Sequence, residues 1–135
     1  MGGSNKCLMG ECMGRVLVVE DDDDNRGYLQ ALLVLDTHEV HTARNGLEAL
    51  TWLRAQRHLP HCIVLDLDMP VMTGQEFFRQ LQNDPRLAHI RVIVLSGDPY
   101  RQTDPLPSTV ARLEKPAAPE MLTNTVARCT RPSHA

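Results

Sequence analysis

Five side chains whose types suit phosphoryl chemistry each stand at the end of a strand that the sequence predicts. They are Glu20, Asp21, Asp66, Ser96 and Lys115. Carboxylate oxygens of this kind are ligands that Mg²⁺ prefers. A carboxylate beside a metal ion, a hydroxyl and an ammonium group can accept a phosphoryl group, because the metal ion and the lysine neutralise charge on the transferring oxygens. The residue types therefore indicate a magnesium-dependent phosphoryl-acceptor site.

Taken singly, each of these residues also has a purely structural interpretation. The acids from Glu20 to Asp24 can simply favour a helix N-terminus, where the helix dipole attracts negative charge. Asp66 can cap a helix or close a turn, and Ser96 can belong to a turn. Lys115 can be a solvated surface lysine. The functional interpretation depends on all of them standing at strand ends within one chain.

Three short apolar runs predict the centre of a parallel sheet. Residues 16–19, 62–65 and 92–95 are apolar without alternation, which is typical of strands buried on both faces. Two further strands are predicted over 38–43 and 110–114. In such a sheet, ligands bind beyond the carboxyl ends of the strands, which is where the five polar side chains stand.

Apolar residues at helical spacing fill the gaps between these strands. The predicted helices lie at 28–35, 47–53, 77–81 and 120–129. Thr73, with Glu76 three residues later, forms the pattern of a capping box before the third of them. Residues 97–109 contain three prolines, each of which costs roughly 3 kcal/mol inside a helix, so the fourth helix of the fold is expected to be short or irregular. The alternation of strands and helices predicts a doubly wound α/β fold.

The overall composition fits one globular domain. Hydrophobic residues make up 42% of the chain and charged residues 23%, and the formal net charge is -3. A mildly acidic chain is a poor candidate for direct nucleic-acid binding. Its apolar runs are far shorter than the ~20 residues that a membrane span needs. We therefore expect neither nucleic acid nor a membrane among its partners.

The cysteines and the chain ends suggest a cytoplasmic protein. The four cysteines show neither a Cys-x-x-Cys pair nor a zinc-type spacing with histidine. The first residues contain no apolar core of a secretory signal. We expect a flexible arm at 1–14, one domain at 15–130 and a short tail at 131–135.

Four segments together resemble the receiver domain of two-component response regulators, the fold of the chemotaxis response regulator. They are Val16–Asp22, Val64–Pro70 with Gly74, Val94–Gly97 and Leu113–Pro116. The resemblance implies a flavodoxin-like sheet of five parallel strands in the order 2-1-3-4-5. It also implies a phosphorelay module, not an enzyme with a separate substrate, whose aspartate is phosphorylated by a histidine kinase or a histidine phosphotransfer protein. The output partner is not identified.

The same resemblance implies a role for each site residue. Asp66 would be the phosphoacceptor, Ser96 the hydroxyl that responds to phosphorylation, and Lys115 the partner of the phosphoryl group. The Lys115–Pro116 peptide bond would be cis.

Three further residues would hold the Mg²⁺ ion together with Asp66. Asp21 would bind the ion directly and Glu20 through a water molecule, while Asp68 would offer its backbone carbonyl.

The sequence departs from the family pattern at several positions. Arg112 stands three residues before the lysine, where the family usually has Tyr or Phe, and Ala117 replaces a common aromatic residue. Turning Arg112 inward would bury a charge, so we expect it to stay outward and phosphorylation to act through Ser96 and residues 97–109. Only residues 130–135 follow the last predicted helix, which suggests a stand-alone receiver or one cut from a longer chain.

Two other functions remain open at this point. Asp66-Leu67-Asp68 faintly resembles the Asp-x-Asp motif of haloacid-dehalogenase-type phosphatases, but Glu120 is the only acid after Lys115 to hold their metal ion. The domain could also be a binding scaffold that is never phosphorylated. Turnover of a phosphoester would reveal a phosphatase, and labelling with acetyl phosphate would exclude the scaffold.

Overall fold

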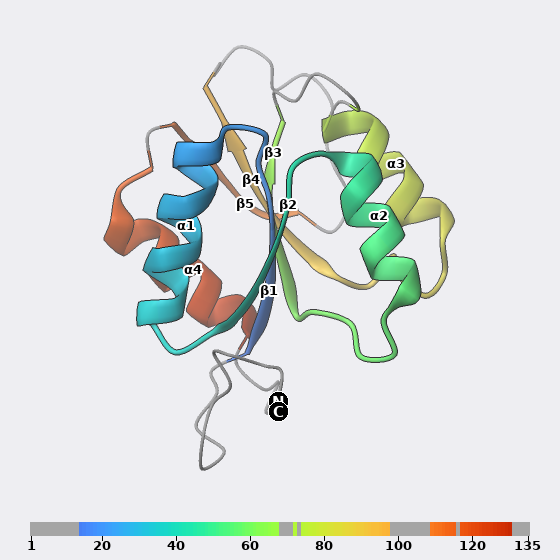
Figure 1. Ribbon diagram of the computed structural model, residues 1–135, viewed down its shortest axis with the longest axis horizontal. Coiled ribbons are helices and arrows are strands. Elements are labelled where there is room, and N and C mark those ends of the chain that lie inside the picture. The colour runs from blue at the N-terminus through green and yellow to red at the C-terminus, as the bar shows by residue number, and fades with distance from the viewer. Residues whose placement is uncertain (1–13, 68–71, 73, 98–108, 116, 131–135) are drawn as a thin grey trace.

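The computed structural model describes residues 14–67, 72, 74–97, 109–115 and 117–130. Five parallel strands form one sheet in the order β2-β1-β3-β4-β5, which confirms the predicted doubly wound topology. Helices α1 and α4 cover one face of this sheet, and α2 and α3 cover the other (Figure 1). The elements in chain order are β1 (Arg15–Val19), α1 (Asp23–Leu35), β2 (Glu39–Ala43), α2 (Gly46–Ala55), β3 (Cys62–Asp66), α3 (Gly74–Asn83), β4 (Arg91–Ser96), β5 (Thr109–Glu114) and α4 (Pro119–Thr130).

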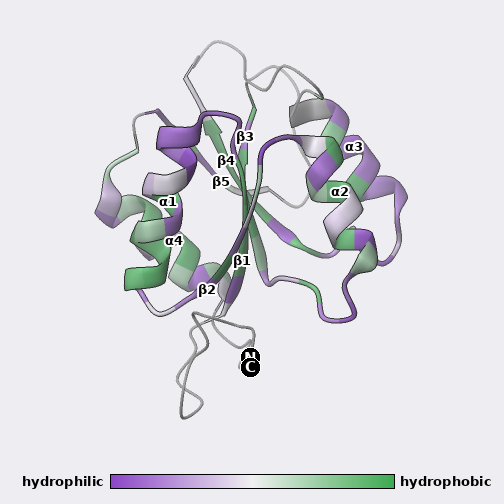
Figure 2. Cartoon of the chain, viewed as in Figure 1, coloured by the Kyte–Doolittle hydropathy of each residue, from purple (hydrophilic) through white to green (hydrophobic). Residues whose placement is uncertain are grey.

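The three apolar runs form the central strands because their side chains are buried on both faces of the sheet. In β1, Leu17 and Val19 pack with residues of α2 and α3, whereas Val16 and Val18 pack with residues of α1 and α4. This alternation follows from the two-residue period of a strand. Figure 2 shows the result as hydrophobic strands in the middle of the molecule and hydrophilic residues where β1 meets α1.

Side-chain caps fix where the first two helices begin. The Asp22 carboxylate accepts a hydrogen bond of 2.8 Å from the Asn25 backbone N–H at the start of α1. At the start of α2, the Asn45 side chain accepts one of 2.8 Å from the Glu48 backbone N–H. Both are N-caps, which satisfy backbone donors that have no partner within the helix. The α1 cap directly follows Glu20 and Asp21 in the chain, so helix α1 begins next to these two acids.

Gly14 belongs to the packed structure, although the sequence places it at the end of a flexible arm. It is buried, and its carbonyl accepts a hydrogen bond of 2.9 Å from the Glu39 backbone N–H. A Cβ atom at this position would lie 2.6 Å from the Cβ of Thr130 in α4. The close approach of α4 therefore requires glycine here, and packing begins one residue before the expected domain boundary.

Several sequence predictions fall outside the described residues. They concern the arm before Gly14, the Asp68 carbonyl, the Thr73 cap, the irregular fourth helix within 97–109, the Lys115–Pro116 bond and the tail at 131–135. Among the residues that the structure does describe, no helix is long and apolar enough to cross a lipid bilayer.

Candidate functional site

The acidic residues meet because β1 and β3 are neighbours in the sheet. Val19 is in register with Leu65, so the residues that follow them, Glu20 and Asp66, lie at the same carboxyl edge. One carboxylate oxygen each from Glu20, Asp21 and Asp66 lies within 4.8 Å of the others. The structure thus brings together the three carboxylates that the sequence places at strand ends.

The three carboxylates differ in their exposure. Glu20 and Asp66 are each only 2% exposed, whereas Asp21 is exposed. Burial raises the pKa of the Glu20 carboxyl from 4.5 to about 7; the Asp66 charge also raises it, while a hydrogen bond from the Asp22 backbone N–H and the Lys115 charge lower it. Without a metal ion, Glu20 therefore holds its proton more tightly than an exposed carboxyl group does.

Arg26 holds the chain that carries Glu20 and Asp21. Its guanidinium donates a hydrogen bond of 3.1 Å to the Glu20 carbonyl and forms an ion pair with Asp23 one turn earlier in α1. The Glu20 backbone N–H donates one of 3.0 Å to the carbonyl of Ala43 at the end of β2. These contacts fix the acidic segment between two strands and the first turn of α1. No motif in the sequence marks Arg26, because its six-residue separation from Glu20 matches no helical pair pattern.

Lys115 reaches the acidic residues from the far side of β4. Its Nζ lies 2.7 Å from Oδ1 of Asp66. This contact links residues that follow β5 and end β3, the strands on either side of β4. The Lys115 backbone N–H donates a hydrogen bond of 2.9 Å to the carbonyl of Ser96, which is buried at the end of β4. The ion pair compensates negative charge that burial would otherwise make very unfavourable.

Arg112 occupies a different position from these residues. It is half-buried in the middle of β5, in register with Val94 of β4. It does not belong to the cluster of Glu20, Asp21 and Asp66. Its part in a response to phosphorylation remains a prediction.

The carboxylate cluster fits a magnesium ion by its chemistry. All three donors are hard oxygen ligands, and the exposure of Asp21 leaves one side of the cluster open to water. Mg²⁺ prefers one or two protein carboxylates and keeps several water ligands. Glu20, Asp21 and Asp66 are therefore suitable residues to hold the ion.

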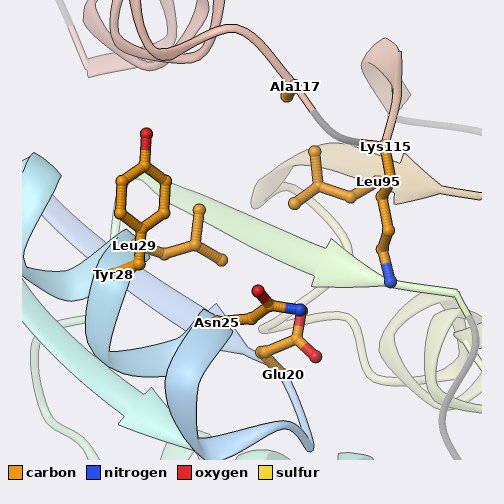
Figure 3. Close-up of a pocket in the computed structure, with 7 residues that line it drawn as sticks. All are labelled: Glu20, Asn25, Tyr28, Leu29, Leu95, Lys115 and Ala117. Carbon is orange, nitrogen blue, oxygen red and sulfur yellow. The ribbon is translucent and has the colours of Figure 1, made fainter.

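A pocket of about 290 Å³ adjoins this cluster. In Figure 3, Tyr28 and Leu29 of α1 lie on one side of it and Leu95 and Lys115 on the other, with Ala117 beyond them. The pocket could not be predicted from sequence, because Tyr28 and Leu29 have the helical spacing of ordinary core residues. The small Ala117 side chain was the only signal of open space.

The family model, a curated relative and two solved structures that match this chain are all response regulators or receiver domains. The sequence model of the family described as the response regulator receiver domain matches residues 16–127. The response regulator PleD of Caulobacter vibrioides is 42% identical over 83 residues, which are 62% of this chain and 18% of PleD. The chain therefore spans less than a fifth of that relative.

Two solved structures are similar over almost their whole length. One is the signal receiver domain of a signal transduction histidine kinase from Syntrophus aciditrophicus, with 31% identity and a TM-score of 0.78 over 87% of this chain and 89% of that chain. The other is the chemotaxis response regulator CheY4 of Vibrio cholerae, with 30% identity and a TM-score of 0.78 over 87% and 98% of the two chains.

Proposed function

The chain belongs to the response regulator receiver domain family, and we propose that it accepts a phosphoryl group on Asp66. Receiver domains are signalling modules of two-component systems, which interact with histidine kinases or phosphotransfer proteins. The donor would be a phosphohistidine of such a protein, and the site of action the cytoplasm. The observation that carries the proposal is the contact of 2.7 Å between Lys115 Nζ and Asp66 Oδ1 beside two further carboxylates.

Asp66 is suited to be the nucleophile by its position. It is buried at the end of a central strand, so its carboxylate is held in one place by the sheet. The adjacent Leu67 backbone N–H donates a hydrogen bond of 3.0 Å to the carbonyl of Leu95, which ties the segment to β4. A carboxylate oxygen that is positioned in this way can attack phosphorus while the donor nitrogen leaves.

Lys115 and Ser96 would act on the oxygens of the phosphoryl group. The Lys115 ammonium, already in contact with Asp66, would neutralise charge on one of them. Ser96 is buried on the neighbouring strand, where its hydroxyl can donate a hydrogen bond to another. A Mg²⁺ ion held by Glu20, Asp21 and Asp66, with the carbonyl of Asp68, would supply further positive charge at these oxygens.

Phosphorylation would then change the binding of an output protein that the sequence does not identify. We propose that Ser96 and residues 97–109 transmit the change, while Arg112 stays outward. No direct contact with nucleic acid or a membrane is part of this function.

Intact-mass measurement after incubation with acetyl phosphate and Mg²⁺ tests the proposal. We expect one added phosphoryl group, which Asp66→Asn abolishes because the amide is not a nucleophile. Asp36→Asn, in a half-exposed acid that precedes β2 at the opposite end of the sheet, is the matched control and should be labelled normally. An Asp66→Asn protein that still gains an equally labile phosphoryl group at the same rate would refute the assignment. Labelling without steady turnover of a phosphoester would also exclude the phosphatase and scaffold alternatives.

A further inference from the structure

The pocket beside the phosphoacceptor joins a charged end to an apolar interior. Glu20 and Lys115 belong both to its lining and to the surroundings of Asp66. The remaining lining is mainly apolar, from the buried Leu29 and Leu95 together with Ala117 and the half-exposed ring of Tyr28. Figure 3 shows Glu20 and Asn25 lying together at one end of this lining. A ligand in the pocket would therefore have its charged group next to Asp66 and its apolar group between α1 and β4.

The volume of the pocket suits a six-membered ring. At about 290 Å³ it is larger than an apolar cavity of roughly 150 Å³ that is known to bind benzene. It lies near the lower end of the range of small-molecule sites, which starts at about 300 Å³. Leucine side chains and the face of a tyrosine ring favour an aromatic occupant over a polar one, because such an occupant buries apolar surface without losing hydrogen bonds to water.

We propose that this pocket holds the apolar leaving group of a phosphoryl donor, so that aromatic acyl phosphates are preferred donors to Asp66. This inference rests on the proposed function. In the reaction, a bond forms between an Asp66 carboxylate oxygen and phosphorus while the bond between phosphorus and the bridging oxygen of the acyl phosphate breaks. The aromatic carboxylate leaves with the bonding electron pair, and no proton or further reactant is needed.

The side chain at position 117 controls the free space in this pocket. Ala117 is half-buried and lines it, whereas its neighbour Ala118 is exposed and does not. A phenylalanine at position 117 would occupy the space that an aromatic leaving group needs. A phenylalanine at position 118 adds the same side chain outside the pocket, which makes Ala118→Phe a matched control.

The first test compares benzoyl phosphate with acetyl phosphate as donors to the full chain in the presence of Mg²⁺. A substitution that changes only the reactivity of Asp66 alters both second-order rate constants by the same factor and leaves their ratio unchanged. We expect Ala117→Phe to lower this ratio by roughly ten-fold or more, which is the usual size of an effect on an apolar pocket, and Ala118→Phe to leave it within about two-fold. An equal ratio in the original protein and in Ala117→Phe would overturn the inference.

A binding measurement tests the pocket without any phosphoryl transfer. Benzylphosphonate carries a ring and methylphosphonate does not, while their anionic groups are alike. In nuclear magnetic resonance titrations of the unmodified protein with Mg²⁺, we expect benzylphosphonate to bind about ten-fold more tightly and to shift the signals of Tyr28 and Leu29. Equal affinities, or shifts elsewhere only, would contradict the inference.

The two measurements separate this inference from the proposed function. If acetyl phosphate labels Asp66 but neither test shows a preference for the ring, the pocket assignment is wrong and the phosphoacceptor assignment stands. If acetyl phosphate does not label Asp66, the proposed function fails, while the phosphonate titrations still decide whether the pocket binds an aromatic group.

Discussion

Replacing Glu20 by glutamine should stabilise the metal-free protein at high pH and leave its stability unchanged at low pH. The pKa of Glu20 is raised from 4.5 to about 7, chiefly by burial. The folded state therefore holds this proton more tightly than the unfolded chain does. The contribution of Glu20 to stability is fully present below pH 4.5 and is lost as the pH rises through about 7.

The pKa rise sets the size of the expected effect. At 1.36 kcal/mol per pKa unit, the rise from 4.5 to about 7 corresponds to about 3 kcal/mol at pH 8. Because Glu20 interacts with Asp66, part of this energy belongs to the pair, and we expect a gain of about 1–3 kcal/mol in Glu20→Gln. The glutamine side-chain oxygen can still accept the hydrogen bond that the Asp22 backbone N–H donates to Glu20.

Urea unfolding between pH 5 and pH 8 in the presence of a chelator measures this gain. The difference in free energy of unfolding between variant and original protein cancels the titration of all other groups. Glu114→Gln, at an exposed position at the end of β5, is the matched control for loss of one negative charge. Adding Mg²⁺ at pH 8 should stabilise the original protein more than Glu20→Gln. A difference that stays flat from pH 5 to pH 8, or a less stable variant at pH 8, would refute the reasoning.

Three further predictions follow from the same structure. Asp21→Asn should weaken the stabilisation by Mg²⁺ and, by removing one of three clustered negative charges, stabilise the metal-free protein; an unchanged response to Mg²⁺ in thermal unfolding would count against the site. Burial lowers the pKa of His38, so the free energy of unfolding should decrease as the pH falls below 6.5. In urea unfolding, His38→Gln in the Glu20→Gln background should remove part of this pH dependence. Phosphorylation should change hydrogen exchange most at residues 97–109, a segment with three prolines, which have no backbone N–H to donate. A change confined to Arg112 and its strand would show that the signal takes another route.

The sequence predicts most of the fold because its signals are local. The apolar runs at 16–19, 62–65 and 92–95 become β1, β3 and β4, since strands that are buried on both faces need no alternation. The meeting of Glu20 with Asp66 follows from the same topology, because the carboxyl ends of parallel strands share one edge.

Other features depend on how elements pack, and local sequence does not encode them. In β5 the register shifts by one residue, so that Val92 pairs with Thr109 but Ile93 pairs with Ala111. No glycine or proline marks this irregularity between Thr109 and Ala111. The shift places Lys115 opposite the end of β4, and thereby decides whether its side chain can reach Asp66.

The pocket and the difference in exposure between Glu20 and Asp21 both depend on how helix α1 packs on the sheet. Glu20 and Asp21 are adjacent in the sequence, yet one is buried and the other exposed in the folded domain. The space between Tyr28 and Leu95 likewise depends on the distance of α1 from the end of β4. A sequence pattern can assign these side chains to a helix or strand, but it cannot give the distance between two elements.

Titratable groups act in opposite directions on the stability of this domain. Glu20 loses its stabilising contribution as the pH rises from 4.5 to about 7. Burial lowers the pKa of His38, and partial loss of water contact lowers the pKa of the more exposed His41 and His61. Protonation of these groups therefore disfavours folding as the pH falls below 6.5. In the metal-free domain, the Glu20 effect and the histidine effect on the free energy of unfolding partly cancel between pH 4.5 and about 7. A cation at the carboxylate cluster would remove the penalty on ionised Glu20 and leave the histidine effect. The stabilisation that the cation gives must therefore grow as the pH rises from 4.5 towards 7.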